Sequence, residues 1–285
     1  MYKRQVLNTL DGNTTGTVNA ATITTFTSST AATLNTAYAS SGISGLGNEA
    51  VTINDTTLAA SVLNTLDGNT SGVVTATSIT LLTGTTAEVN TSYANNTGSG
   101  LVLSSAGSIL GLGNEAVTIS DTSLAVAALN TLDGNTTGSV NAATVLTLTG
   151  TAAAVNTAYA SSGITNLGNE AVTLSDTSLA ATVLNTLDGN TTGAVNAATV
   201  TTLTGLAADA NTAYASSGIS GLGNEAVTLS DTSLAATVLN TLDGNTSGAV
   251  NAATVQTLTG TAAAVNTSYA SSGISGLGDE AVTLS

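Results

Sequence analysis

The sequence contains no cysteine, histidine, proline or tryptophan. Without cysteine the chain can form no disulfide and has no thiol chemistry. Because histidine is also missing and the only lysine is Lys3, the nucleophile–base pairs and imidazole metal sites of enzymes cannot be assembled. No apolar run reaches the roughly 18 residues that a membrane-spanning helix needs. We therefore expect neither an enzyme nor a membrane-inserted protein.

Basic residues are almost absent as well. Lys3 and Arg4 are the only cations, against 17 carboxylates along the chain. A surface that neutralises nucleic-acid phosphates needs clustered lysine and arginine, so we expect no nucleic-acid partner. Anionic membrane surfaces are disfavoured for the same reason. Any bound cation would have to come from solution.

Aromatic residues make up 2% of the chain, while 42% of its residues are hydrophobic, mostly Ala, Val and Leu. A core built from such small side chains must be thin. This composition suits a stacked array of short coils better than a globule around one wide centre.

A tandem repeat dominates the sequence. The string LNTLDGN begins at five positions, namely Leu7, Leu63, Leu129, Leu184 and Leu239. The differences between successive start numbers are 56, 66, 55 and 55, so the repeat has a period of 55. The second copy is longer because it carries an insertion near residues 95–110, which we expect to form a loop.

These boundaries predict one solenoid array over residues 6–285. We interpret residues 1–5 (MYKRQ) as a non-native leader, since they match nothing in the repeat. The five copies cover residues 6–62, 63–128, 129–183, 184–238 and 239–285, and the last is truncated. We expect a fragment, because neither end shows the atypical repeat that usually closes a solenoid.

Each repeat divides into two related halves with the order strand, cap, helix and glycine turn. In the first half we expect a strand at residues 172–174, a helix cap among residues 175–177 and an apolar helical face over residues 179–187. Gly189, in a left-handed conformation, would end that helix. In the second half the strand is expected at residues 145–148, before a helix that ends at Gly163.

The fold class that follows is an α/β solenoid. Each repeat would contribute two strand–helix coils, stacked into a parallel sheet with the helices on one side. Because Thr, Asn and Ser are abundant in the expected helices and favour other structures, an all-β solenoid is the alternative.

Carboxylates recur in three columns, one residue of each per repeat. The column just before the helix is best explained by helix capping; its members are Asp55, Asp121, Asp176 and Asp231. A second column precedes the strand, at Glu49, Glu115, Glu170, Glu225 and Glu280.

The third column lies in the motif D-G-N-T-[TS]-G, which matches the opening of calcium-binding loops. Its candidate ligands are Asp11, Asn13, Asp67, Asn69, Asp133, Asn135, Asp188, Asn190, Asp243 and Asn245. The position that supplies the bidentate glutamate of an EF-hand holds Thr or Ser instead, so a plain glycine turn is the favoured interpretation. If calcium is a cofactor here, its sites are expected to be weak.

Two further columns are uncharged. One tyrosine per repeat falls on the apolar helix stripe, and we expect core packing for it; the residues are Tyr38, Tyr93, Tyr159, Tyr214 and Tyr269. Thr-x-Thr pairs, as at Thr147/Thr149, resemble the flat threonine face of ice-binding solenoids. They occur once per two coils, so β-propensity explains them better.

The segments LNTLDGNTTGAVNAATVTTLTG (184–205) and TAYASSGISGLGNEAVTLSDTSLAAT (212–237) carry a resemblance. They are similar to repeats of very large secreted proteins of marine cyanobacteria and related bacteria, which are often described as RTX-like or adhesin-like. The resemblance covers residues 6–285. It implies an extracellular or cell-surface location, and often calcium.

We therefore expect a structural repeat or stalk segment of a secreted or cell-surface bacterial protein that supports adhesion or matrix formation. Its partners would be neighbouring repeats of the same parent chain. A weak calcium-binding repeat module and an ice-binding threonine face are the alternatives.

Overall fold

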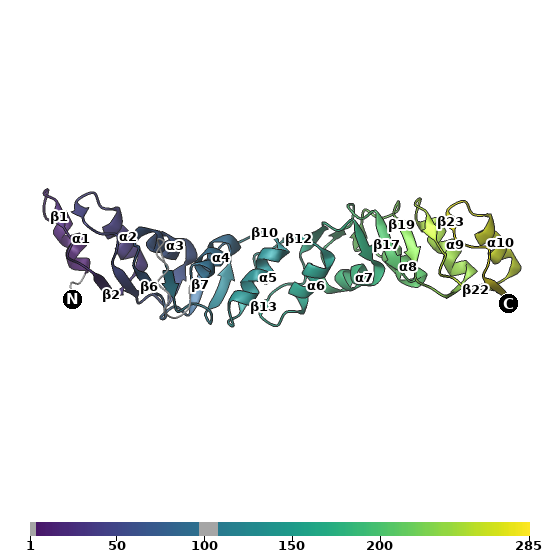
Figure 1. Cartoon of the computed structure of the whole chain (residues 1–285), viewed down its shortest axis with the longest axis horizontal. Coiled ribbons are helices and arrows are strands. Elements are labelled where there is room, and N and C mark those ends of the chain that lie inside the picture. The colour runs from purple at the N-terminus through teal and green to yellow at the C-terminus, as the bar shows by residue number, and fades with distance from the viewer. Residues whose placement is uncertain (1–3, 97–107) are drawn as a thin grey trace. The chain divides into compact units, whose positions relative to one another are not determined.

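The computed structural model describes residues 4–96 and 108–285 (Figure 1). Helices alternate with short parallel strands throughout these residues, which confirms the α/β solenoid. The described residues hold ten helices: α1 (Arg4–Gly12), α2 (Ala31–Ala39), α3 (Ala60–Asn69), α4 (Thr86–Ala94), α5 (Val126–Asn135), α6 (Ala152–Ala160), α7 (Ala181–Asn190), α8 (Ala207–Ala215), α9 (Ala236–Asn245) and α10 (Ala262–Ala270).

The chain folds as two compact units. Unit 1 comprises Met1–Thr122, Ala128–Thr144 and Ser162–Asn166, and unit 2 comprises Ser123–Ala127, Val145–Ser161 and Leu167–Ser285. Helices α1 to α4 contact one another in sequence within unit 1, and α6 to α10 do so within unit 2. Each unit is thus built by stacking coils that contact their immediate neighbours, as expected for a repeat array.

The strands of each unit are short. Unit 1 contains β1 (Val18–Asn19), β2 (Thr25–Ser29), β3 (Ile43–Ser44), β4 (Ala50–Ile53), β5 (Thr57–Ala59), β6 (Val73–Thr75), β7 (Leu81–Gly84), β8 (Ser108–Leu110), β9 (Ala116–Ile119), β11 (Val140–Asn141) and β13 (Ile164–Thr165). Unit 2 contains β10 (Ser123–Ala125), β12 (Thr147–Gly150), β14 (Ala171–Leu174), β15 (Ser178–Ala180), β16 (Val195–Asn196), β17 (Thr202–Gly205), β18 (Ile219–Ser220), β19 (Ala226–Leu229), β20 (Ser233–Ala235), β21 (Val250–Asn251), β22 (Thr257–Gly260), β23 (Ile274–Ser275) and β24 (Ala281–Leu284).

Strand pairing is parallel, but the sheet is divided. One sheet has the order β10-β12-β14-β16-β18 and the next has β15-β17-β19-β21-β23. Two steps of strand pairing lead from Ser178 through Thr202 to Ala226. Two helix steps, from the start of α7 to the start of α9, cover a longer stretch of chain, from Ala181 to Ala236. Two steps between paired strands therefore cover a shorter stretch of chain than two steps between stacked helices, so the paired strand shifts its place relative to the helix from coil to coil.

This shift divides the sheet. Each sheet moves along successive coils, and a new sheet starts in successive repeats, at β5, β10, β15 and β20. The continuous sheet expected from the sequence is therefore a series of sheets of up to five strands.

The core is thin and built from small side chains, as the composition predicts. Strand residues such as Val172 and Leu203 point inward, and each helix adds a stripe such as Ala152, Val155 and Ala158 in α6. Alanine at the first position of a helix is completely buried in several coils, including Ala152. Small residues there let neighbouring coils approach closely.

Two local predictions for the first half of the repeat are wrong. The helix expected from Leu179 starts at Ala181, because Leu179 lies in β15 and pairs with Leu203. Gly189 lies inside α7 and does not have a positive φ. The helix ends at Asn190, and its C-cap Thr191 is extended with φ −126° and ψ 146°. The hydroxyl of Thr191 donates to the carbonyl of Glu170 over 2.8 Å, which holds the chain in an extended path after the helix.

Other boundaries differ less. The strand expected at residues 145–148 is β12, which starts at Thr147. Arg4 and Gln5 belong to the expected leader but are the first residues of α1. Within the expected insertion loop (95–110), residues 97–107 lie outside the described residues. The loop prediction is wrong for Ser108–Leu110, which form β8 and pair with β6.

Candidate functional site

The helix-preceding aspartates do cap helices, but not the helices that follow them. Asp176 Oδ2 accepts from the backbone N–H of Ala152, the first residue of α6 in the preceding coil, over 2.8 Å. The prediction that these aspartates cap helices is therefore confirmed, but the helix that it named is wrong, since β15 separates Asp176 from the start of α7. The other members of the column bind in the same way: Asp55 to Ala31, Asp231 to Ala207, and Asp121 to both the N–H and the hydroxyl of Thr86.

The aspartates of the D-G-N motif lie in the last turn of alternate helices. Asp188 Oδ2 in α7 accepts from the hydroxyl of Ser216, the C-cap residue of α8, over 2.7 Å. Each such carboxylate therefore fixes the C-terminal end of the next helix. The same bond joins Asp11 to Ser40 and Asp243 to Ser271.

The asparagines of the same motif face the opposite neighbour. Asn190 Nδ2 donates to Asn156 Oδ1 of the preceding helix α6 over 2.9 Å. Asp188 and Asn190 thus bind helices on either side of α7, and the structure does not bring these candidate calcium ligands together. Among the described residues, no three His, Cys, Asp or Glu side chains form a group that could hold a metal. The asparagine bond recurs from Asn69 to Asn35, from Asn135 to Asn90 and from Asn245 to Asn211.

Asp67 is the exception within this column. It is buried, its Oδ2 accepts from Asn95 Nδ2 over 2.9 Å, and its Oδ1 has no partner among the described residues. Burial raises the pKa of Asp67 above the ordinary range, although the bond from Asn95 opposes the shift. The serine found at this position in other copies is replaced by Asn95, next to the insertion.

The glutamate column is buried and paired with the tyrosine column. Glu170 Oε2 accepts from the backbone N–H of Gly168 over 2.8 Å and from the hydroxyl of Tyr159 over 2.9 Å. Glu170 and Glu225 each keep one buried oxygen without a partner among the described residues. In the other copies the tyrosine hydroxyl binds the glutamate likewise: Tyr38 to Glu49, Tyr93 to Glu115, Tyr214 to Glu225 and Tyr269 to Glu280.

Each tyrosine of this column therefore donates a hydrogen bond to a buried glutamate as well as packing in the coil. Burial, with a contribution from the neighbouring carboxylate, raises the pKa of Tyr38, Tyr93, Tyr159 and Tyr214 above the usual tyrosine range. The protonated hydroxyl holds the glutamate in the turn. The sequence carried a signal for this pair, since tyrosine precedes glutamate by the same spacing in every copy without the insertion.

A ladder of asparagines joins successive helices. Asn156 Nδ2 of α6 donates to the carbonyl of Val183 in α7, and Asn185 of α7 donates to the carbonyl of Asp209 in α8, over 3.1 and 2.9 Å. The threonine that follows each asparagine, as in Thr157, donates back to the carbonyl four residues earlier. Residues that weaken an isolated helix thus bind neighbours in the stack or satisfy its own backbone. The ladder bond recurs in both units, from Asn8, Asn35, Asn64, Asn90, Asn211 and Asn240.

The threonine pairs flank buried residues on the outer side of the strands. Thr147 and Thr149 lie on either side of Leu148 in β12. Alanine and asparagine interrupt the threonine row that an ice-binding face would need. The row through Thr149 contains Ala125, Thr149, Thr173, Asn196 and Ser220 on successive strands.

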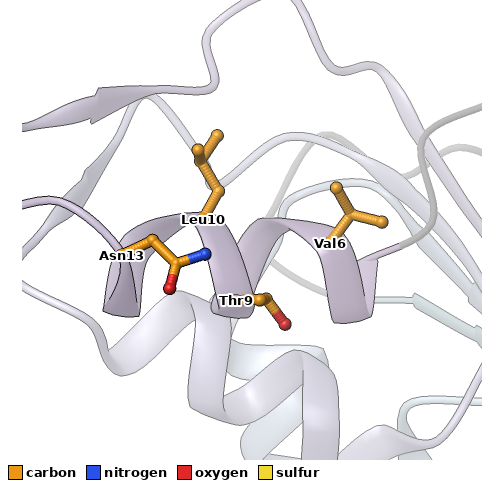
Figure 2. Close-up of a pocket in the computed structure, with 4 residues that line it drawn as sticks. All are labelled: Val6, Thr9, Leu10 and Asn13. Atoms are coloured by element: carbon orange, nitrogen blue, oxygen red, sulfur yellow. The ribbon is translucent and has the colours of Figure 1, made fainter.

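A groove lies on α1 of unit 1. Val6, Thr9, Leu10 and Asn13 line it (Figure 2). These four residues offer aliphatic, hydroxyl and amide groups and no titratable side chain.

Comparisons with protein-family models, curated proteins and solved structures find no match for this chain. No helix among the described residues has the length and apolar character needed to cross a membrane.

Proposed function

We propose that the chain is a structural repeat, or stalk, segment of a secreted or cell-surface bacterial protein that supports adhesion or matrix formation. One observation carries the proposal: the polar side chains that recur in each repeat bind the neighbouring coil. Asp176 caps α6, Asp188 holds the end of α8, and Asn156 binds α7. Side chains that could bind a ligand are used instead to join one coil to the next.

The secreted location rests on the resemblance of the repeats to those of very large secreted proteins. The charge of the chain agrees with partners that are neither nucleic acid nor anionic membrane, because Lys3 and Arg4 are its only cations. The neighbouring repeats of a parent chain are the partners that these contacts fit best. We propose no catalytic role, since the sequence contains neither histidine nor cysteine.

Adding repeats tests the structural role. Proteins carrying one, two and three further copies of residues 184–238 should show a maximum dimension in solution scattering that grows in equal steps. Their free energy of unfolding should also rise, because each copy adds another set of contacts between coils. A maximum dimension that stays constant as copies are added would contradict the proposal.

Calcium titration separates this role from the calcium-binding alternative. The D-G-N side chains already bind neighbouring helices, so we expect no heat of binding in calorimetry and no shift in melting temperature beyond that given by magnesium. A saturable calcium heat lost in Asp188→Asn would favour the alternative. A thermal-hysteresis assay tests the ice-binding face in the same way, and we expect no activity.

A further inference from the structure

The D-G-N-T-[TS] motif has a feature that the contacts between coils leave unused. In every repeat it reads Asp-x-Asn-x-Thr/Ser, as in residues 188–192 (DGNTT). Asn-x-Ser/Thr is the acceptor sequence of N-linked glycosylation. The oligosaccharyltransferases of bacteria also favour an acidic residue two positions before the asparagine, where this motif has its aspartate. The asparagines concerned are Asn13, Asn69, Asn135, Asn190 and Asn245.

The groups that a glycosylating enzyme must reach are exposed in this motif. Both Asn190 and Thr192 are exposed. Asn190 Nδ2 carries two N–H groups, donates one to Asn156 Oδ1 over 2.9 Å, and has no second acceptor within the described part of the chain. The Thr192 hydroxyl makes one long bond, 3.4 Å to the carbonyl of Gly168. Replacing one hydrogen of Asn190 Nδ2 by a sugar carbon therefore leaves an N–H for the bond to α6.

The motif also lies where a helix opens most easily. Asn190 is the last residue of α7, and its C-cap Thr191 is extended. Gly189 precedes Asn190 in the last turn, and a Cβ on Gly189 would meet nothing within 4 Å. Helix ends fray, and glycine is a poor helix former. The segment can therefore take the extended form that an enzyme cleft requires while the rest of the coil stays folded.

A second segment of the chain has the same sequence pattern in a different environment. Residues 88–92 (EVNTS) also place an acid two positions before an Asn-x-Ser triplet. They lie inside α4, where Asn90 Nδ2 donates to the carbonyl of Ala128 over 3.0 Å. Ser92 is 0% exposed and donates to Asn64 Oδ1 over 2.7 Å. The two segments therefore share the pattern and differ in access.

We propose that the D-G-N-T-[TS] segments are acceptor sites for N-linked oligosaccharide, which is attached to the folded chain at the ends of alternate helices. The inference rests on the proposed secreted location, because such transfer takes place outside the cytoplasm. The donor is an oligosaccharide whose first sugar carbon is joined to a polyprenyl diphosphate. Asn190 Nδ2 forms a bond to that carbon and loses one proton. The bond between the carbon and the diphosphate oxygen breaks, and polyprenyl diphosphate leaves.

The sites have room for one oligosaccharide each. Within unit 2, Asn190 and Asn245 occupy the same end of α7 and α9, and α8 packs between these two helices. Neighbouring helices lie roughly 8 to 10 Å apart, so the two sites are roughly 16 to 20 Å apart. The oligosaccharides would form a hydrated row along the helix ends of the unit, which suits a stalk exposed to its surroundings.

Glycosylation in vitro tests the proposal without relying on the stalk role or on secretion. The purified folded chain is incubated with a bacterial oligosaccharyltransferase and a defined polyprenyl-diphosphate oligosaccharide. Intact-mass spectrometry should show the mass rising in whole steps of one oligosaccharide. Peptide mapping should place the additions at the D-G-N asparagines and not at Asn90. No addition, or an equal occupancy at Asn90, would overturn the proposal.

A synthetic peptide of residues 86–94 is the control for Asn90. It has the same sequence without the packing of α4. We expect the enzyme to modify the peptide, because the fold and not the sequence protects Asn90 in the chain. An unmodified peptide would contradict this role of the fold.

Variants at one site show whether the motif is recognised as proposed. Thr192→Val removes the hydroxyl at nearly equal volume and should abolish addition at Asn190 while Asn245 is still modified. Thr192→Ser is the matched control and should retain the addition, since Ser247 occupies the equivalent position of another repeat. Circular dichroism should show both variants folded. Addition at Asn190 that survives Thr192→Val would overturn the assignment of this motif as the acceptor.

Discussion

The two helices of a repeat are stabilised by different means, as α6 and α7 show. Helix α6 buries only small residues, Ala152, Val155 and Ala158. Its N-terminus is capped twice, by the hydroxyl of Thr151 on the N–H of the third helical residue and by Asp176 on the N–H of Ala152. Small buried residues give little apolar stabilisation, so hydrogen bonds at its end fix this helix.

Helix α7 shows the reverse. It follows β15 directly, and Ala180 at its N-cap offers no side-chain bond. Instead it buries Leu184 and Leu187 completely. The repeat therefore alternates a helix stabilised by buried leucines with a helix stabilised by hydrogen bonds at its N-terminus.

Shortening a buried apolar side chain should lower the free energy of unfolding more in α7 than in α6. We expect Leu187→Ala to lower the free energy of unfolding by about 2–5 kcal/mol, because Leu187 is fully buried and its loss leaves a cavity. Val155→Ala in α6 removes fewer atoms and should cost less. Equilibrium urea denaturation measures both, with Leu146→Ala at an exposed position as the control. Equal losses at Val155 and Leu187 would end the distinction between the two helices.

The turn after α7 is the next most sensitive place. A Cβ on Gly193 would lie 2.2 Å from the carbonyl oxygen of Glu170, so Gly193→Ala forces the coils apart and should cost about 1–3 kcal/mol. Gly189→Ala is the matched control, because the space around Gly189 is open and the residue is helical. That control should be neutral or stabilising by about 0.5–1 kcal/mol. Thermal denaturation of the two variants makes the comparison, and similar losses would show that the close approach does not matter.

Removing the aspartate cap of α6 should lower the free energy of unfolding by a smaller amount and expose amides at one end of that helix. Asp176→Ala should cost about 1 kcal/mol, because it frees the N–H of Ala152. Amide hydrogen exchange should show lost protection at the start of α6 and not in α7, which follows Asp176 in sequence. Asp279→Ala removes an equal charge from an exposed turn and serves as the control. Loss of protection confined to α7 would mean that the aspartate caps its own helix.

The smallest effect concerns the buried carboxyl of α3. Since burial raises the pKa of Asp67, the folded chain holds this proton more tightly than the unfolded chain. Its contribution to stability is therefore full below the unfolded-state pKa and is lost as pH rises through the folded-state pKa. Asp67→Asn should raise the urea midpoint slightly at neutral pH and less at acid pH.

Asp188→Asn is the control for that change, because Asp188 binds Ser216 and has no buried oxygen without a partner among the described residues. It should not raise the midpoint. A gain at Asp188 equal to that at Asp67 would refute the burial argument.

Periodicity predicted the repeat, the alternation of strand and helix and the buried stripe that includes Leu187. These features depend on spacing within one coil, which the sequence displays directly. The target of Asp176 and the pairing of Tyr159 with Glu170 could not be predicted in this way, because they depend on which residues the stacking of coils brings together. The division into several sheets was missed for a related reason. It depends on how far along the chain the next paired strand begins, which no motif marks.

The alternation of capped and apolar helices has a consequence for how such a gene can change in length. Asn190 of α7 bonds to Asn156 of α6, and Asp188 to Ser216 of α8, so each helix type needs the other type on both sides. Recombination that gains or loses the codons of one whole repeat restores every one of these contacts. A crossover that removed a single helix would place two helices of one type side by side without partners. The number of repeats is therefore free to vary between descendants of the gene, but only in whole pairs of helices.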